Sequence, residues 1–106
     1  VPLVVMCDDA SYSNGEMFPY AMHQRGLAKL VGKRTPGYVI WTTGLPLVDG
    51  TNGRMPGSGV YRMDGTPIEN NGQQVDYSVE LPPEAFFAGQ DPKLDKAVQV
   101  LLGGKM

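Results

Sequence analysis

The stretch that decides the fold is Val4-Val5-Met6-Cys7-Asp8-Asp9-Ala10-Ser11-Tyr12-Ser13-Asn14-Gly15-Glu16-Met17-Phe18. Its short apolar beginning predicts a buried strand over Val1–Asp9. A tight, serine-rich turn follows, and a helix is predicted over Gly15–Arg25, with Gly26 as its C-terminal stop. Glu16 falls in the first turn of this helix, where the helix dipole favours an acidic side chain. The pattern therefore predicts a strand, a tight turn and a helix in direct succession.

Further short strands and a second helix are predicted beyond this unit. The pair Asp64-Gly65 lies between two strand-like segments and is a strong hairpin-turn signal. Asp91 can cap the second helix and Pro92 suits its first position. No internal repeat or linker is visible, so residues 1–106 are predicted to form one mixed α/β unit. The predicted strands are Leu27–Val31, Gly37–Trp41, Leu45–Asp49, Val60–Met63 and Val75–Leu81, with a Gly-rich loop before Val60. The second helix is predicted over Asp91–Leu102 and ends at Gly103-Gly104. It carries an apolar stripe of Leu94, Val98, Leu101 and Leu102.

Composition excludes several classes of function. Apolar residues make up 42% of the 106 residues and charged residues 19%, which is typical of a globular domain. The net charge is -2 and the nine basic residues form no dense run, so no surface for nucleic acid or an anionic membrane is expected. No apolar run approaches the ~20 residues that span a bilayer. The single cysteine, Cys7, excludes an internal disulfide and is expected to be a small buried residue.

Ser13 is the best candidate for a functional residue. A serine at a strand–turn–helix junction has its hydroxyl near the free amides of a helix N-terminus, which can stabilise an oxyanion. The amide of Asn14 is the natural donor. The alternative is that Ser13 only caps the helix, as serines often do, because Ser13-Asn14-Gly15 is just half of a Gly-x-Ser-x-Gly elbow. Ser11 is a rival nucleophile that lies further from the helix.

The sequence offers no base for this serine. A serine nucleophile needs a neighbouring base, and the only histidine is His23. It lies on the same predicted helix, roughly 15 Å along the axis from Ser13 at ~1.5 Å per residue, and is expected to face solvent. Asp8, Asp9, Lys33-Arg34 and Glu69 are by themselves typical of solvated turns and strand ends. No cluster has zinc-ligand spacing, and no phosphate loop is present, so no metal or cofactor is expected.

Three stretches together resemble the tail-specific and tricorn peptidase family. Ala10–Phe18 is similar to the family's serine-rich turn and Glu-bearing helix, which places the family nucleophile on Ser13. The second stretch, Gly26–Gly37, resembles the family's Gly-Arg/Lys-Thr-x-Gly turn after the nucleophile helix. In the processing peptidases a catalytic lysine follows, but Tyr38 stands there in this chain. A serine–lysine dyad is therefore not supported.

The third stretch resembles the tricorn branch. The resemblance runs from Leu47 through Ile68-Glu69-Asn70-Asn71-Gly72 to a closing segment, Ala88–Val98, that is similar to the tricorn terminal helix. It implies that Glu69 belongs to the catalytic tetrad. Val75 departs from the family, which usually has a proline before the aspartate at this position. The resemblance covers nearly the whole chain and implies the C-terminal part of a serine peptidase domain with a crotonase/ClpP-like mixed α/β core.

The resemblance also implies what this chain lacks. In tricorn enzymes a histidine activates the serine, and a second serine joins that histidine to the glutamate; both come from upstream sequence. The abrupt start at Val1, without Met, suggests a fragment. We therefore expect a peptide or protein substrate, the missing N-terminal half as a partner, little activity in isolation and self-association of the chain. The alternative, motivated by Tyr38 and the missing base, is a non-catalytic binding or assembly module on the same scaffold.

Overall fold

A small parallel sheet forms the centre of the molecule. The computed structural model describes residues 1–103. Its three-stranded sheet has the order β1-β2-β5, with β1 at Val4–Cys7, β2 at Lys29–Gly32 and β5 at Tyr77–Ser78. All pairs are parallel, so each connection must cross from one end of the sheet to the other. The C-terminal ends of β1, β2 and β5 therefore lie at the same edge of the sheet.

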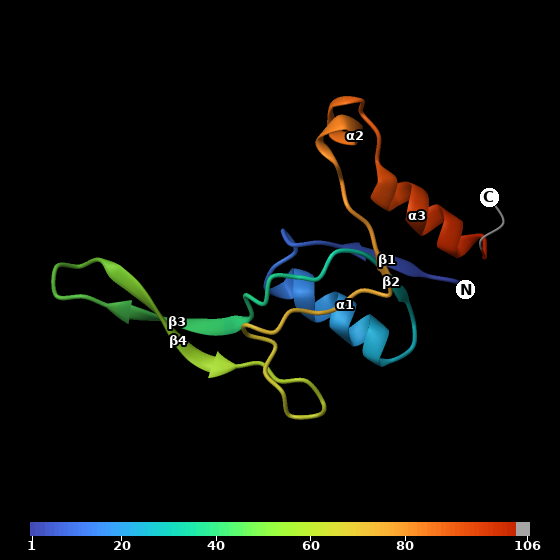
Figure 1. Ribbon diagram of the computed structural model, residues 1–106. Helices are drawn as coiled ribbons and strands as arrows, with labels where there is room; N and C mark the ends of the chain where they lie inside the picture. The colour runs from blue at the N-terminus through green and yellow to red at the C-terminus, as the bar shows by residue number, and fades with distance from the viewer. Residues whose placement is uncertain (104–106) are drawn as a thin grey trace.

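Two helices cover the faces of this sheet. Helix α1, at Asn14–Gln24, packs on one side of β1 and β2, and α3, at Pro92–Leu101, packs on the other (Figure 1). Gly26 ends the α1 turn with a φ of 67°, and Asp91 Oδ1 caps α3 by accepting from the Leu94 amide at 3.0 Å. The strand, both predicted helices and their caps are thereby confirmed to within a few residues, although Gly104 lies outside the described residues. The buried apolar core consists of Cys7, Ala28, Leu30, Val31, Val39, Ile68, Ala85 and Ala97.

A long antiparallel hairpin extends away from this body. Strands β3, at Ile40–Pro46, and β4, at Asn52–Gly59, pair along their whole length and form the arm at the left of Figure 1. The sequence-based assignment was wrong here: Asn52–Gly59 was expected to be a loop, and the single strand β3 replaces two predicted strands, Gly37–Trp41 and Leu45–Asp49. Glycine and proline are depleted in strands, yet this strand is an edge strand with an irregular register opposite Trp41 and Thr42, where such residues are tolerated. Trp41, on this arm, is 59% exposed.

The remaining differences concern short segments. Val60–Met63 is not a strand: only an isolated bridge between Tyr61 and Pro67 flanks the Asp64-Gly65 turn, which itself is confirmed, with Gly65 at φ 89°. The strand predicted over Val75–Leu81 shrinks to the two residues of β5, and an additional short helix, α2, occupies Pro83–Phe87. Local pattern alone does not distinguish a short paired strand from an extended loop.

The predicted apolar stripe of α3 faces outward in this chain. Its four residues are at least 36% exposed, whereas Ala97 is the buried residue of the helix. Within residues 1–103, no helix combines the length and apolar character needed to cross a bilayer.

Candidate active site

Ser13 occupies a strained turn between β1 and α1. Its φ of 57° and ψ of -118° lie in a region that residues with a side chain seldom adopt. Such strain persists only where the surrounding structure imposes it, and it is a feature of nucleophile elbows, in which a sharp turn presents the serine hydroxyl. Only Ser13 and Asn70 among the non-glycine residues 1–103 have a positive φ. The half-buried Ser13 side chain is therefore held in a conformation that a simple cap does not require.

The hydrogen bonds at this turn bear on the capping alternative. The Glu16 amide lies near the Ser13 side chain as in a capping box, but it donates to the Ser13 carbonyl, at 2.9 Å, and no regular side-chain cap bond forms. Within residues 1–103, the amide of Asn14 donates to no protein acceptor. A free amide directly after Ser13 is the geometry that an oxyanion donor needs.

Glu16 anchors this turn to a distant segment. Its carboxylate is fully buried, with 0% exposure. Oε1 accepts from the Gly37 amide at 2.6 Å, and Oε2 accepts from the Tyr38 amide at 2.7 Å and from the Ser13 amide at 3.3 Å. The Ser13 amide also donates to the Tyr38 carbonyl at 3.1 Å. The backbone of Tyr38, the residue in the place of the processing-peptidase lysine, is thus bonded directly to the candidate nucleophile.

Glu69 is attached to the same segment. The Val39 amide donates to its Oε2 at 2.6 Å, so three successive amides, those of residues 37–39, donate to the two glutamates. The Asn70 amide donates to the Gly37 carbonyl at 2.7 Å, with Asn70 at φ 60°. No hydrogen bond joins Glu69 to Ser13 within the described part of the chain. Ser13 and Glu69 are each hydrogen-bonded to the segment of residues 37–39, and not to each other.

The rival groups are engaged elsewhere. The Ser11 hydroxyl accepts from the Asp8 amide at 3.0 Å, which closes the turn after β1. His23 is exposed, as predicted, and its Nε2 lies 3.1 Å from Asp76 Oδ1. Cys7 is 2% exposed, and burial raises the pKa of its thiol to about 11, so the thiolate is scarce near neutral pH. None of these side chains is arranged to compete with Ser13 or to activate it.

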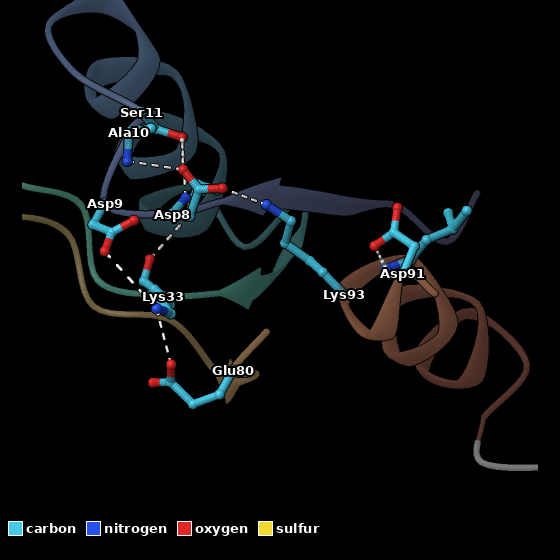
Figure 2. Close-up of polar contacts among 10 residues, drawn as sticks. Asp8, Asp9, Ala10, Ser11, Lys33, Glu80, Asp91 and Lys93 are labelled. Atoms are coloured by element: carbon cyan, nitrogen blue, oxygen red, sulfur yellow. Dashed lines mark hydrogen bonds and ion pairs between the residues drawn. The ribbon is translucent and has the colours of Figure 1, made fainter. Parts of the chain in front are cut away.

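Ion pairs hold the carboxyl ends of the strands beside this turn (Figure 2). Asp8, directly after β1, pairs with Lys93 of α3, and the hydrogen bond from that ammonium lowers the pKa of the Asp8 carboxyl. Lys33, directly after β2, pairs with Glu80 at 2.9 Å and with Asp9 at 3.8 Å. Both lysines therefore have carboxylate partners, and among residues 1–103 neither is hydrogen-bonded to Ser13. No group of three or more potential metal-ligating side chains was found among residues 1–103.

Ser13 and Asn14 could be named as candidates from the sequence, but the contacts of Glu16 could not. The Ser-x-x-Glu spacing from Ser13 to Glu16 is a capping-box signal. Its stronger partners, the amides of Gly37 and Tyr38, lie 21 and 22 residues further along the chain. A local pattern does not contain that contact.

The chain is similar in sequence and structure to known peptidases. The chain is 31% identical to the tricorn protease of Thermoplasma acidophilum over 102 residues, covering 94% of this chain and 10% of that protein. It superposes on a crystal structure of the tricorn protease with a TM-score of 0.89, at 31% identity, covering 96% of this chain and 10% of that chain. For the photosystem II D1 C-terminal processing protease, the TM-score is 0.65 at 25% identity, covering 98% of this chain and 25% of that chain.

The chain spans about a tenth of the length of the Thermoplasma tricorn proteases that it matches. The sequence model described as "Peptidase family S41" matches residues 1–79, which include β1, α1, Ser13, Glu16 and Glu69. The mixed α/β class expected from the sequence is confirmed by these neighbours. This chain belongs to peptidase family S41.

Proposed function

We propose that this chain carries the nucleophile-bearing part of a serine peptidase active site, with Ser13 as the nucleophile. The observation that carries the proposal is the strained turn at Ser13, followed by the free amide of Asn14. Backbone strain of this kind gathers at active sites, because the strain is part of how a reactive group is presented. Membership of a peptidase family supports the same role.

The proposed reaction is acyl transfer to Ser13 followed by hydrolysis. Ser13 Oγ forms a bond to the carbonyl carbon of a peptide while its proton passes to a histidine base, and the carbonyl oxygen becomes an oxyanion held by the Asn14 amide. The carbon–nitrogen bond then breaks, and the leaving amine takes the proton from the histidine. Water releases the acyl group and restores Ser13. By resemblance to the tricorn branch, the histidine comes from upstream sequence.

Glu69 is proposed to orient the side of the site that carries the missing base. Its Oε2 is fixed by the Val39 amide, while its Oε1 accepts no hydrogen bond from residues 1–103. In the tricorn branch the corresponding glutamate meets a second serine that positions the histidine. The free oxygen of Glu69 is suited to such a partner, because a carboxylate oxygen accepts a hydroxyl hydrogen bond readily.

The isolated chain is proposed to be inactive or nearly so. Triad chemistry depends on a base within hydrogen-bond reach of the serine, and His23 is paired with Asp76 instead. The proposed partners are therefore the N-terminal half of the same peptidase and a peptide or protein substrate. The chain also exposes apolar side chains on the β3–β4 arm and on α3, which supports self-association in the absence of that half.

A second candidate function is a non-catalytic binding or assembly module. It is favoured by one specific observation, the presence of Tyr38 where processing peptidases carry a catalytic lysine. The two candidates differ in what an upstream half must contain. A serine–histidine pair there supports the enzyme, and its absence supports the module.

Peptide hydrolysis tests the proposal. A longer polypeptide that includes the upstream residues should cleave a peptide library, and Ser13→Ala should abolish the cleavage. Glu69→Gln should reduce kcat by about 10²-fold or more, because a misplaced base is costly. Matched Glu84→Gln, an exposed glutamate in the first turn of α2, should have no effect. Cleavage by the isolated chain that Ser13→Ala removes would contradict the need for a second half.

A further inference from the structure

We propose that Glu16 is a positioning residue that fixes the nucleophile turn against the segment holding Glu69. The inference rests on the proposed function of Ser13 and deepens it. Nothing in the reaction requires Glu16 to touch the substrate. Its part is to set where the Ser13 hydroxyl and the Asn14 amide stand relative to residues 37–39.

The distances distinguish this role from ordinary helix capping. A capping glutamate reaches back to the amide of the N-cap residue, here Ser13. That bond is present, but at 3.3 Å it is the longest of the three. The bonds to Gly37 and Tyr38 are 2.6 Å and 2.7 Å, within the range of charge-assisted hydrogen bonds. The Glu16 carboxylate therefore makes its shortest hydrogen bonds to Gly37 and Tyr38, and through them it joins the Ser13 turn to that segment.

The burial of the Glu16 carboxylate makes its hydrogen bonds to the backbone costly to lose. Within the described residues no basic side chain pairs with the Glu16 carboxylate, so backbone amides alone compensate its removal from water. A glutamine cannot reproduce this, because its amide nitrogen is a donor and would face either the Gly37 amide or the amides of Tyr38 and Ser13. One side of the contact must open. The strained φ of Ser13 then loses part of the surroundings that impose it.

Gly37 adds a second constraint at the same point. Its φ is 83°, and a Cβ there would lie 2.8 Å from the Asn71 nitrogen. The segment that donates to Glu16 therefore packs tightly against the segment that carries Glu69. If the hydrogen bonds between Glu16 and Gly37 shift, the segment that carries Glu69 should shift too, because the two segments are closely packed at Gly37.

Fluorophosphonate labelling of the longer, upstream-containing polypeptide tests the proposal. We expect Glu16→Gln to slow the labelling of Ser13 by at least about 10-fold, with a labelling end point that still reaches completion. A complete end point excludes an irreversibly unfolded fraction, and thermal denaturation of Glu16→Gln shows whether the variant is folded at the labelling temperature, so slower labelling of the folded variant reports mispositioning. Glu84→Gln is the matched control and should label at the wild-type rate, because that glutamate is exposed at the start of α2.

Hydrogen exchange on the unaltered chain keeps the test independent of whether the variant folds. The amides of Gly37 and Tyr38 should exchange slowly, whereas the amide of Asn14, which has no acceptor in the described residues, should exchange fast. Rapid exchange at Gly37 and Tyr38 would overturn the inference, as would wild-type labelling by folded Glu16→Gln. If wild type itself is not labelled at Ser13, the proposed function fails and the role of Glu16 falls with it; labelled wild type with an unaffected variant refutes Glu16 alone.

Discussion

At the scale of the residue, the strained conformation of Ser13 lowers the stability of the fold while it presents the side chain for the proposed reaction. A residue with a side chain at φ 57° carries about 1–3 kcal/mol of strain. Glycine reaches such conformations without steric cost but loses about 0.5–1 kcal/mol through the entropy of the unfolded chain. The balance favours glycine at this position, so the serine is present despite its effect on the fold.

Ser13→Gly should therefore be more stable than Ser13→Ala. The expected difference in the free energy of unfolding is about 0.5–2 kcal/mol, because alanine keeps the strain and glycine relieves it. Urea denaturation of the two variants measures it, and both lack the nucleophile, so the comparison isolates the backbone. A glycine variant that is less stable than the alanine variant would show that the turn at Ser13 is not strained.

Sequence reasoning at this scale succeeded where the signal was local. A serine in the tight turn between a predicted strand and a predicted helix marked Ser13 and Asn14 as candidates, and the structure gives them a strained turn and a free amide. It did not find the part played by Glu16. That residue resembled an ordinary first-turn glutamate such as Glu84, and its burial and its hydrogen bonds to Gly37 and Tyr38 distinguish it.

At the scale of the element, α3 is attached to β1 by the ion pair of Lys93 and Asp8 (Figure 2). The hydrogen bond from the ammonium lowers the pKa of the Asp8 carboxyl below that of the unfolded chain. A group with a depressed folded-state pKa stabilises the fold above its unfolded pKa of about 4, and this stabilisation is lost as the pH falls through the folded value. The attachment of α3 should therefore weaken in acid.

Lys93→Met should lower stability at pH 6 by about 0.5–1 kcal/mol, as is usual for a part-exposed pair. The difference from wild type should shrink as the pH approaches 3, because Asp8 is then becoming protonated in both proteins. Urea midpoints measured from pH 6 to pH 3 give the curve. Lys96→Met, on the same helix, is the control and should leave the pH dependence unchanged; a constant difference between Lys93→Met and wild type would contradict the role of Asp8.

The segment that contains Thr35 and the segment that contains Gly72 pack closely against each other. A Cβ on Gly72 would lie 1.7 Å from the Thr35 carbonyl oxygen, far closer than two non-bonded heavy atoms can approach. Gly72→Ala should therefore cost about 2–4 kcal/mol in the free energy of unfolding. Gly44→Ala, on the open β3 strand with nothing within 4 Å, should change it by less than about 1 kcal/mol. Equal effects in thermal or urea denaturation would mean that the segments do not pack as described.

Elements with strong local signals were predictable, and those made by pairing were not. Helices α1 and α3 have caps and stops in the sequence, and both were found. Strand β4 contains Gly53, Pro56, Gly57 and Gly59, so its composition indicated a loop. It becomes a strand because β3 lies antiparallel to it across the short turn at Asp49-Gly50, a partner that propensity does not describe.

At the scale of the whole molecule, the chain is more extended than is usual for a domain of its length. Its radius of gyration is 17.3 Å, whereas about 13 Å is usual for this length. Its accessible surface is 7377 Å², against about 5,800 Å² for a folded monomer of its 11.5 kDa. The excess is larger than the roughly 800 Å² that one partner contributes to a standard interface. Exposed apolar side chains lie on the arm, which projects from the rest of the chain in Figure 1, and on α3.

The isolated chain should therefore self-associate in a concentration-dependent way. Sedimentation velocity across a range of concentrations measures this, and a clean monomer at the highest concentration would contradict it. Trp41→Gln on the arm and Leu101→Gln on α3 identify the surface involved, since each removes an exposed apolar group without a buried contact of the core. Association should weaken in at least one of them, because apolar burial is its driving force.

The central claim is that Ser13 is a peptidase nucleophile completed by residues outside this chain. Fluorophosphonate labelling, read by intact mass and peptide mapping, tests it most directly in the isolated chain and in the longer, upstream-containing polypeptide. We predict one adduct, on Ser13, in the longer polypeptide only. Absence of labelling in both proteins, each shown to be folded, or an adduct on Ser11 in place of Ser13, would contradict the claim.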